Sequence, residues 1–251
     1  MKDLNISIVI ALVKKNFTLK YKQTLLGFLW SLLHPAFFLL IFIAVFSSIF
    51  KTVENYPLYV LSGLVFFLYF SEATNRLSGI FIKNSHMIKN YGLSKITYPL
   101  AEIGSELVTF LIGLVPFMII MYFMGMNIHF HLLYLLPIII LFTIFTFTVG
   151  IILGSLNVFF RDIGILWITL SPALFYMSPI VYNYEIIPEK FKLFIAMNPL
   201  YHFLIIIRDV IYLHQAPQLR YVGICLIITS VTTLIAILTY RKTNNSFISN
   251  L

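Results

Sequence analysis

The chain has 251 residues, of which 60% are hydrophobic and only 10% are charged, and its mean hydropathy is +0.96. Soluble globular proteins carry about 25% charged residues, so this composition excludes an ordinary soluble fold. The charges leave long uncharged runs at 23–50, 55–71, 107–160, 163–184 and 221–240. Because roughly 20 apolar residues in a helix cross a bilayer, most of these runs can cross once, and 107–160 can cross twice. The sequence therefore predicts an all-α, polytopic membrane protein.

Other composition signals narrow the class. The formal net charge of +8 is assigned to membrane topology and to anionic lipid headgroups, and we expect no nucleic-acid partner. The single cysteine, Cys225, cannot form an internal disulfide. No stretch outside the apolar runs reaches the roughly 50 residues of an independent domain, so one membrane domain is expected. No cleavable signal peptide is predicted, because the apolar patch at 6–13 is short and two lysines follow it.

Residues 1–32 are predicted to form an element in the membrane interface. Apolar residues from Ile6 to Phe17 follow one helical stripe, while lysines and small polar residues follow another. This pattern is typical of an amphipathic helix that lies flat on the membrane. Such a helix is either a simple anchor or a collar that presents lysines to an anionic substrate at the cytoplasmic entrance. The candidate entrance residues are Lys14, Lys15, Lys20 and Lys22.

Six membrane-spanning helices are expected within 33–240, at 33–50, 56–73, 98–124, 132–159, 164–182 and 221–240. Lys and Arg are retained on the cytoplasmic side of a membrane protein, and they orient these spans. Twelve fall on the side of the two termini, and the other five are Lys51, Lys190, Lys192, Arg208 and Arg220. Both termini are therefore predicted to be cytoplasmic, with 241–251 as a tail.

The longest inner connection, 75–97, is predicted to contain a short helix parallel to the membrane. Its stretch 80–91 mixes apolar residues with Lys83, His86 and Lys89, and Gly92 offers a helix stop. Such a helix is suited to docking a soluble partner, and a plain solvated linker is the alternative. The charged turn Arg161–Asp162 is either a hairpin cap or part of the same contact surface.

The segment 183–220 holds two apolar pieces, each too short to span a bilayer alone. They are interrupted by Asn198 and Pro199, which favours re-entrant or interfacial helices on the outer side. Backbone that leaves the helix at membrane depth must be buried in protein or line a wet cavity, so this region is a candidate gate. Its candidate residues are Asn198, Pro199, Tyr201 and Arg208. A seventh span through 200–212 is the alternative, and it would place the C-terminus outside.

Aromatic residues and two carboxylates mark the spans themselves. Most aromatic stripes face lipid or a neighbouring helix. A conduit for a sugar polymer is the alternative, with candidates Phe38, Phe42, Phe46, Phe175, Tyr176 and Tyr182. Glu102 and Glu106 share one face at the start of the third span. Carboxylates at membrane depth are expected to be functional, and here a structural or gating role is favoured over a proton relay.

Several catalytic patterns are missing from the sequence. There is no P-loop motif, no H-E-x-x-H and no G-x-S-x-G. His129 and His131 stand together in an outer turn without a third ligand, which is more typical of a headgroup-level turn than of a metal site. We therefore expect a chain that is not an enzyme and that holds no cofactor or metal.

Four motifs in order resemble a known family. They are YKQTLLGFLWSLLHP at 21–35, NVFFRDI at 157–163, SPIVY at 178–182, and NPL at 198–200 with Arg208 after it. Together they resemble the permease subunits of type-2 ABC exporters of polysaccharides and teichoic acids, and the likeness covers essentially the whole chain. The inner loop NSHMIKNYGLSKITYP departs from the family, which has an apolar residue and Phe-Pro nearer its centre. This departure loosens the register of the docking helix.

The resemblance implies a homodimer with a channel between the first and fifth spans, and two copies of a separate ATPase that binds ATP and Mg. The implied docking residues are Lys83, His86, Met87, Ile88, Lys89 and Tyr91, with Arg161 and Asp162. The implied substrate is a polyprenyl-pyrophosphate-linked glycan of O-antigen or capsular type, exported across the inner membrane of a bacterium. The entrance lysines would meet its phosphates.

Other functions stay open at this point. The nearest alternative is a permease of the same fold that exports teichoic acid or a small hydrophobic drug. A membrane enzyme such as a lipid-glycan transferase would need clustered acidic metal ligands, which the sequence lacks. A passive structural membrane protein would depend on no ATPase.

Overall fold

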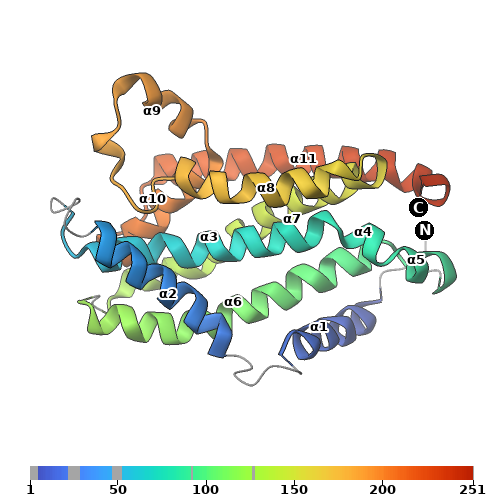
Figure 1. The fold of residues 1–251 in the computed structure, drawn as a ribbon, viewed down its shortest axis with the longest axis horizontal. Coiled ribbons are helices and arrows are strands. Elements are labelled where there is room, and N and C mark those ends of the chain that lie inside the picture. The colour runs from blue at the N-terminus through green and yellow to red at the C-terminus, as the bar shows by residue number, and fades with distance from the viewer. Residues whose placement is uncertain (1–4, 22–28, 47–52, 92, 126–127, 251) are drawn as a thin grey trace.

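Long apolar helices run side by side along one axis of the molecule (Figure 1). The computed structural model describes residues 5–21, 29–46, 53–91, 93–125 and 128–250. The first half contains α1 (Ile6–Tyr21), α2 (Leu29–Phe46), α3 (Tyr56–Ser78), α4 (Ile80–Lys83), α5 (Ser85–Tyr91) and α6 (Thr97–Phe123). The second half contains η1 (Phe130–Tyr134), α7 (Leu135–Phe159), α8 (Asp162–Met177), η2 (Tyr184–Ile186), α9 (Glu189–Ala196), α10 (Pro199–Ile211) and α11 (Leu219–Asn250).

The predicted all-α class is confirmed, and the described part of the chain contains no strand. Within it, four helical stretches are long and apolar enough to cross a membrane: α3, α6, the continuous η1–α7 stretch, and α11 up to Thr243. They match the second, third, fourth and sixth predicted spans. The first predicted span overlaps the 18-residue α2 and the fifth overlaps the 16-residue α8, and neither helix is among these four. The count of six spans stays a prediction.

Helix α3 lies at the centre of the bundle, and most of its side chains are buried. Aromatic rings fill the space around it. The ring of Phe66 meets that of Phe110 on α6 at 5.2 Å between centroids, and the ring of Phe70 stacks on Phe145 of α7 at 5.7 Å. Phe203 of α10 closes the same cluster at 5.1 Å from Phe145. Much of the high aromatic content is therefore used in core packing.

Two glycines let α7 approach α3 closely. A Cβ atom on Gly154 would lie 2.6 Å from the backbone oxygen of Leu77, and one on Gly150 would overlap the Leu77 side chain. The pair has the G-x-x-x-G spacing that allows close contact between membrane helices. On its other side α7 packs along α11, where the hydroxyl of Thr148 donates to that of Thr232 at 3.1 Å. The end of α3 is thus held firmly against α7.

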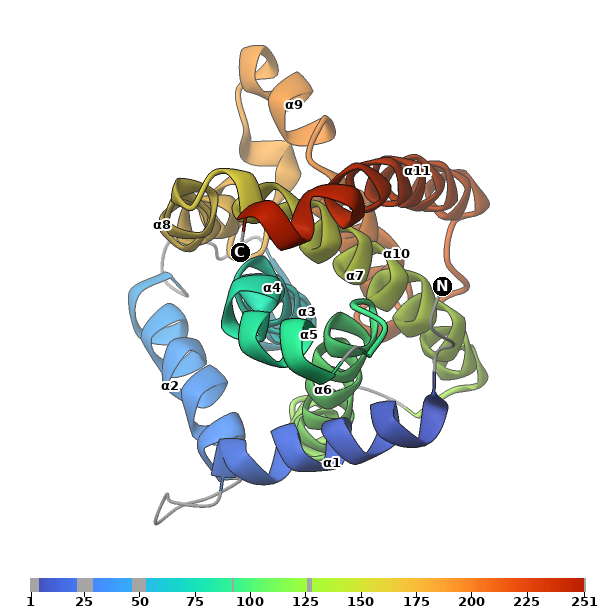
Figure 2. The same cartoon turned by 90° about the vertical axis from the view of Figure 1, so that its right-hand side faces the viewer.

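The charged residues separate toward one end of the bundle. Helices α1, α4 and α5, the α7–α8 turn and the end of α11 lie toward this end, which we call the charged end (Figure 1). Figure 2 shows that α1 runs across the bundle rather than along it. The opposite end carries η1, α9, α10 and the starts of α3 and α11 (Figure 1). The orientation of α1 is the one expected for an interface helix.

Two predicted short elements have different boundaries from those expected. The docking helix over 80–91 is divided into α4 and α5 by Asn84, whose backbone leaves helical geometry. The fifth span ends at Met177 rather than at Tyr182, because Ser178 is extended before Pro179. Residues before a proline are disfavoured in helical conformation, which explains this end.

The interruption at Asn198 and Pro199 is confirmed. Helices α9 and α10 meet there at an angle of 88°. The side chain of Asn198 accepts a hydrogen bond from the backbone N–H of Leu200 at 3.0 Å, and Pro199 occupies the first turn of α10. Both residues favour a helix start. Helix α10 returns into the bundle with Phe203 and Ile206 fully buried, whereas α9 stands clear of it (Figure 2).

Candidate functional site

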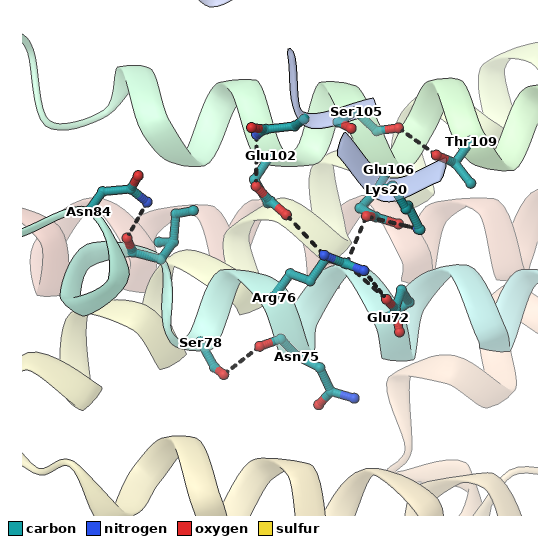
Figure 3. Close-up of polar contacts among 12 residues, drawn as sticks. Lys20, Glu72, Asn75, Arg76, Ser78, Asn84, Glu102, Ser105, Glu106 and Thr109 are labelled. Carbon is teal, nitrogen blue, oxygen red and sulfur yellow. Dashed lines mark hydrogen bonds and ion pairs between the residues drawn. The ribbon is translucent and has the colours of Figure 1, made fainter. Parts of the chain in front are cut away.

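An ion cluster joins α1, α3 and α6 near the charged end (Figure 3). The Nζ atom of Lys20 on α1 lies 2.9 Å from an Oε atom of Glu106 on α6. The Nε atom of Arg76 on α3 lies 2.9 Å from the other Oε atom of Glu106 and one of its terminal nitrogens lies 2.8 Å from Glu72. Another terminal nitrogen of Arg76 is 3.9 Å from Glu102. One guanidinium therefore serves three carboxylates.

Burial of the two α6 carboxylates explains this arrangement. The side chains of Glu102 and Glu106 are only 7% and 5% exposed. An isolated buried carboxylate is strongly destabilising unless a cation or hydrogen-bond donors accompany it. Glu102 also accepts a hydrogen bond from Nδ2 of Asn16 on α1 at 2.9 Å. Both carboxylates bond side chains of α1, and the structural or gating role of this pair stays a prediction.

The cluster borders a polar cavity of about 230 Å³ between α1, α3 and α6, lined in part by Asn16, Lys20 and Arg76. A second cavity of about 140 Å³ is lined by residues of α1, α4, α5 and α6, among them Lys15, Lys83 and Met87. The ion cluster and the predicted docking helices thus share one polar region of the charged end.

The entrance lysines do not all behave as expected. Lys14 and Lys15 are exposed, as a headgroup-binding role requires. Lys20 differs from the expectation that the lysines face headgroups and water, because it turns toward α6 to pair with Glu106. A headgroup at Lys20 would have to compete with this ion pair. Lys22 lies outside the described residues.

The predicted docking residues divide between the surface and the bundle. Lys83, His86 and Lys89 are exposed, and so are Arg161 and Asp162 at the α7–α8 turn of the same end. Met87 is partly buried. Ile88 is 8% exposed and packs in a cluster with residues that include Ile80, Phe81 and Tyr98, so it attaches α5 to the bundle instead of facing outward. The side chain of Tyr91 lies outside the described residues.

The predicted channel aromatics occupy different environments. Phe38 on α2 is 39% exposed and Tyr176 on α8 is 68% exposed. Phe175, in contrast, is buried and meets Phe67 of α3 at 5.2 Å between ring centroids. Neighbouring residues in a helix point in different directions, so Phe175 and Tyr176 cannot line the same face. The hydroxyl of Tyr182 donates to the backbone oxygen of Tyr176 at 2.7 Å, and the side chains of Phe42 and Phe46 lie outside the described residues.

At the opposite end, Arg208 of α10 holds the turn that follows α8. Its guanidinium donates to the backbone oxygens of Pro179 and Ile180 at 2.7 and 2.9 Å and to the hydroxyl of Tyr59 at 2.8 Å. The guanidinium carbon also lies 3.6 Å from the centre of the Tyr59 ring, a cation–π contact. This buried cation is stabilised by backbone oxygens and an aromatic ring.

Asn198 and Tyr201 are also buried, whereas Pro199 is partly buried. The side chain of Asn198 donates to the hydroxyl of Ser178 at 2.9 Å and to the backbone oxygen of Met177 at 3.4 Å. Tyr201 is 8% exposed and stacks on Tyr184 at 4.9 Å between ring centroids. Residues at both ends of α10 therefore bind the turn that follows α8. Gating at this point would require these contacts to break or shift.

The outer histidine pair has a third neighbour that sequence reasoning missed. The ring of His214 lies 5.0 Å from that of His129, and His129 lies 5.6 Å from His131. Burial and the nearby His129 lower the pKa of His214 below its ordinary value of 6.5. No group of three side chains suited to holding a metal ion is found among the described residues. The three rings join the turns that precede η1 and α11 at the end of the bundle opposite the charged end.

Comparison with known proteins identifies the family. The family model described as ABC-2 type transporter matches residues 8–212. The chain belongs to the ABC-2 type transporter family. It is 30% identical over 244 residues to an O-antigen export system permease protein RfbA of Klebsiella pneumoniae, covering 96% of this chain and 93% of the relative.

Two further relatives of this ABC-2 transporter chain have related names. It is 25% identical to a polysialic acid transport protein KpsM of Escherichia coli over 250 residues, covering 96% of this chain and 95% of the relative. It is 23% identical to an O-antigen export system permease protein RfbA of Myxococcus xanthus, covering 84% and 82%. The relatives match nearly from end to end, so the predicted resemblance to permease subunits of ABC exporters is confirmed.

Two residues that bind the α6 carboxylates in this ABC-2 transporter chain were missed from the sequence. Sequence reasoning treated Arg76 only as a topological charge and Asn16 not at all, although both bind the α6 carboxylates. A signal was present for Arg76, because it follows Glu72 by one helical turn at the end of a span. No comparable signal distinguishes Asn16 from other polar residues of α1.

Proposed function

We propose that this chain is the permease subunit of an ATP-driven exporter for a polyprenyl-pyrophosphate-linked polysaccharide of O-antigen or capsular type. One observation carries the proposal: the chain matches, over nearly its full length, permeases and transport proteins named for O-antigen and polysialic acid. Both names denote carbohydrate polymers. The bundle supplies the membrane part of such a machine, and a partner must supply the motor.

In this proposal the charged end faces the cytoplasm of a bacterium, and the chain lies in its inner membrane with both termini inside. The concentration of Lys and Arg at that end supports the orientation. The chain acts as a homodimer with two copies of a separate ABC ATPase, which binds ATP and Mg. Residues 1–32 form the interface element, 33–240 the permease domain and 241–251 the tail.

The exposed side chains of α4 and α5 are the proposed ATPase contact, with Arg161 and Asp162 beside them. Lys83, His86 and Lys89 project from the bundle, while Ile88 anchors α5 to it. A docking helix needs this arrangement. The ion cluster behind these helices ties α1 to the same region. Movement of the ATPase would therefore reach α1, α3 and α6 together.

The proposed path lies along the faces of α2 and α8 that the rest of the chain leaves uncovered. Figure 2 shows both helices on the same side of the bundle. Phe38 and Tyr176 are exposed on them and offer aromatic faces to a sugar chain. Lys14 and Lys15 are available to the pyrophosphate at the cytoplasmic surface, since lysines near a membrane surface attract anionic groups.

The test is to delete the gene and follow the lipid-linked glycan of the cell. Export predicts loss of the surface polymer and retention of full-length lipid-linked glycan inside, both restored by the wild-type gene. Normal surface polymer in a strain without a second exporter would contradict the proposal. Retention of a teichoic acid, or sensitivity to a small hydrophobic drug alone, would instead identify one of the alternative substrates.

A further inference from the structure

A row of polar contacts joins α3 to α8 in the middle of the bundle. The indole N–H of Trp167 on α8 donates to the hydroxyl of Thr74 on α3 at 3.0 Å. One turn further along, the hydroxyls of Ser71 and Ser171 lie 2.6 Å apart. These are direct side-chain bonds between two helices that are far apart in the sequence. The hydroxyl of Thr74 also donates to the backbone oxygen of Phe70 at 2.8 Å, so it bonds within α3 and to α8 at once.

Contacts between the α3 and α8 segments, both apolar and polar, continue to the far end of the two helices. Toward the opposite end, the ring of Phe67 meets that of Phe175 at 5.2 Å between centroids. Beyond it, the hydroxyl of Tyr59 donates to the backbone oxygen of Tyr182 at 3.0 Å. Residue numbers fall along α3 while they rise along the α8 segment, as two antiparallel helices in one register require. The contacts therefore run along the whole interface.

Asn157 of α7 completes the row at the charged end. Its side-chain N–H donates to the backbone oxygen of Ser78 at 2.8 Å, and its side-chain oxygen accepts from the backbone N–H of Gly164 at 2.9 Å. Ser78 is the last residue of α3 and Gly164 lies in the first turn of α8. One 5%-exposed amide thus satisfies a free helix-end carbonyl and a free helix-start N–H together.

This junction is tightly packed. A Cβ atom on Gly164 would lie 2.9 Å from Nδ2 of Asn157, so the amide fits against a glycine. On the other side, Gly154 brings α7 against the backbone of Leu77. The junction also sits where α3 gives way, through Gly79, to α4 and α5. The proposed ATPase contact is therefore attached directly to the start of the row.

We propose that Asn157, Trp167 and Ser171 are positioning residues that make α8 move with α3 as one body. The inference rests on the proposed function, in which the ATPase binds α4 and α5. The α3–α8 body would transmit movement of the ATPase from these helices to the channel face of α8. The inner face of α8 is bonded to α3, and its other face carries exposed residues such as Ile168 and Tyr176. The channel then opens along the exposed face of α8, where the α3–α8 body meets the other wall of the channel. It does not open between α3 and α8.

A disulfide across the row tests this. Cysteines replace Ser71 and Ser171 in a Cys225→Ala background, which removes the one native thiol. Since the two hydroxyl oxygens lie 2.6 Å apart, an oxidant should join the two sulfurs. If α3 and α8 move together, cells with the oxidised variant should export at least about four-fifths as much glycan as with the reduced one. Export that is lost on oxidation and regained with reductant would overturn the proposal.

The remaining outcomes are also decisive. Failure of the two cysteines to join under oxidant, in a protein that still exports, would overturn the contact itself. If neither the wild type nor the Cys225→Ala variant exports glycan, the proposed function itself is refuted. The two failures are therefore distinguishable, because only the first occurs in a working exporter.

A second pair of variants tests the transfer of movement. Trp167→Phe and Asn157→Leu remove the side-chain hydrogen bonds and leave apolar side chains in their place, and we expect export per ATP hydrolysed by the purified complex to fall at least about fivefold. The matched control is Thr169→Val, which alters an exposed hydroxyl of α8 that bonds only within its own helix. Unchanged export per ATP in the first two variants would contradict a positioning role.

Discussion

Lys20 of α1 and Glu106 of α6 form an ion pair at 2.9 Å, although 86 positions separate them in the sequence. The pair is largely removed from solvent, with Lys20 19% and Glu106 5% exposed. It fixes α1, the predicted interface helix, to a helix long enough to span the membrane. The attachment of α1 is therefore electrostatic as well as apolar, and it depends on a few side chains.

Replacing Lys20 by Met should loosen α1. Glu106 would keep Arg76 but lose one buried charge partner, which is expected to cost about 1–3 kcal/mol. Hydrogen exchange of the α1 amides should accelerate in the purified protein. Lys14→Met is the matched control, since Lys14 is exposed on the same helix. Equal exchange in both variants would show that the ion pair does not hold α1.

Replacing Gly154 by Ala should separate α7 from α3. The added methyl would lie 2.6 Å from a backbone oxygen, which cannot rotate away, so the helices must shift. Overpacking of this kind costs about 1–3 kcal/mol and should lower the Tm of the detergent-solubilised protein. Gly113→Ala on α6 is the control, because a Cβ atom there meets nothing within 4 Å. There the Tm should stay level or rise slightly.

Replacing Arg208 by Lys should free the turn after α8. An ammonium cannot reproduce the planar fork that binds Pro179, Ile180 and Tyr59 together, so the two backbone oxygens can no longer both accept from this side chain. Proteolysis or hydrogen exchange at 177–182 should increase. Arg220→Lys serves as the control, since Arg220 is exposed at the same end. If 177–182 stays as protected as in the wild type, the guanidinium of Arg208 does not hold this turn.

Reversing the charges of Lys83 and Lys89 should weaken binding of the partner ATPase. Both side chains project from the proposed docking helices, and negative charge there would be repelled by an acidic groove that binds the lysines. Less ATPase should co-purify with the double Glu variant. The matched control reverses Lys190 and Arg220, which are exposed at the opposite end. Undiminished co-purification of the first variant would count against this surface.

Mild acid should loosen the outer histidine contact. The pKa of His214 is lowered below 6.5 by burial and by His129, so the folded protein takes up its proton later than the unfolded chain. The contact therefore stabilises fully above pH 6.5, and this contribution is lost as the pH falls through the lower folded value. The protection factors of the amides at 212–218, which are corrected for the intrinsic pH dependence of exchange, should decrease between pH 7 and pH 5. His214→Gln should remove most of that decrease, and an unchanged decrease would contradict the assignment.

Sequence reasoning placed most helices because their signals are local. Uncharged runs of span length predicted α3, α6, α7 and α11, and Asn198 with Pro199 predicted the break before α10. It placed the ends less well. Asn84 divides the docking helix, and Ser178 ends α8 early, because one residue's backbone geometry decides each boundary.

The candidate site could be predicted only in part. Lys83 and Lys89 are exposed as expected, since a charged residue beside a span rarely buries. Ile88 and Phe175 face the bundle instead, because helical rotation is set by neighbouring helices. Lys20 pairs with Glu106 because two buried carboxylates needed cations, and no local pattern reveals which cation arrives.

By itself, the sequence determined the class, the positions of the apolar helices and the segregation of charge, since hydropathy and Lys/Arg bias act residue by residue along the chain. Only the tertiary structure decided which polar groups meet. Arg76 with Glu106, Arg208 with Tyr59, and Asn157 with Gly164 join segments distant in sequence. A buried polar group is costly without a partner, and the packing of the helices decides which partner it meets.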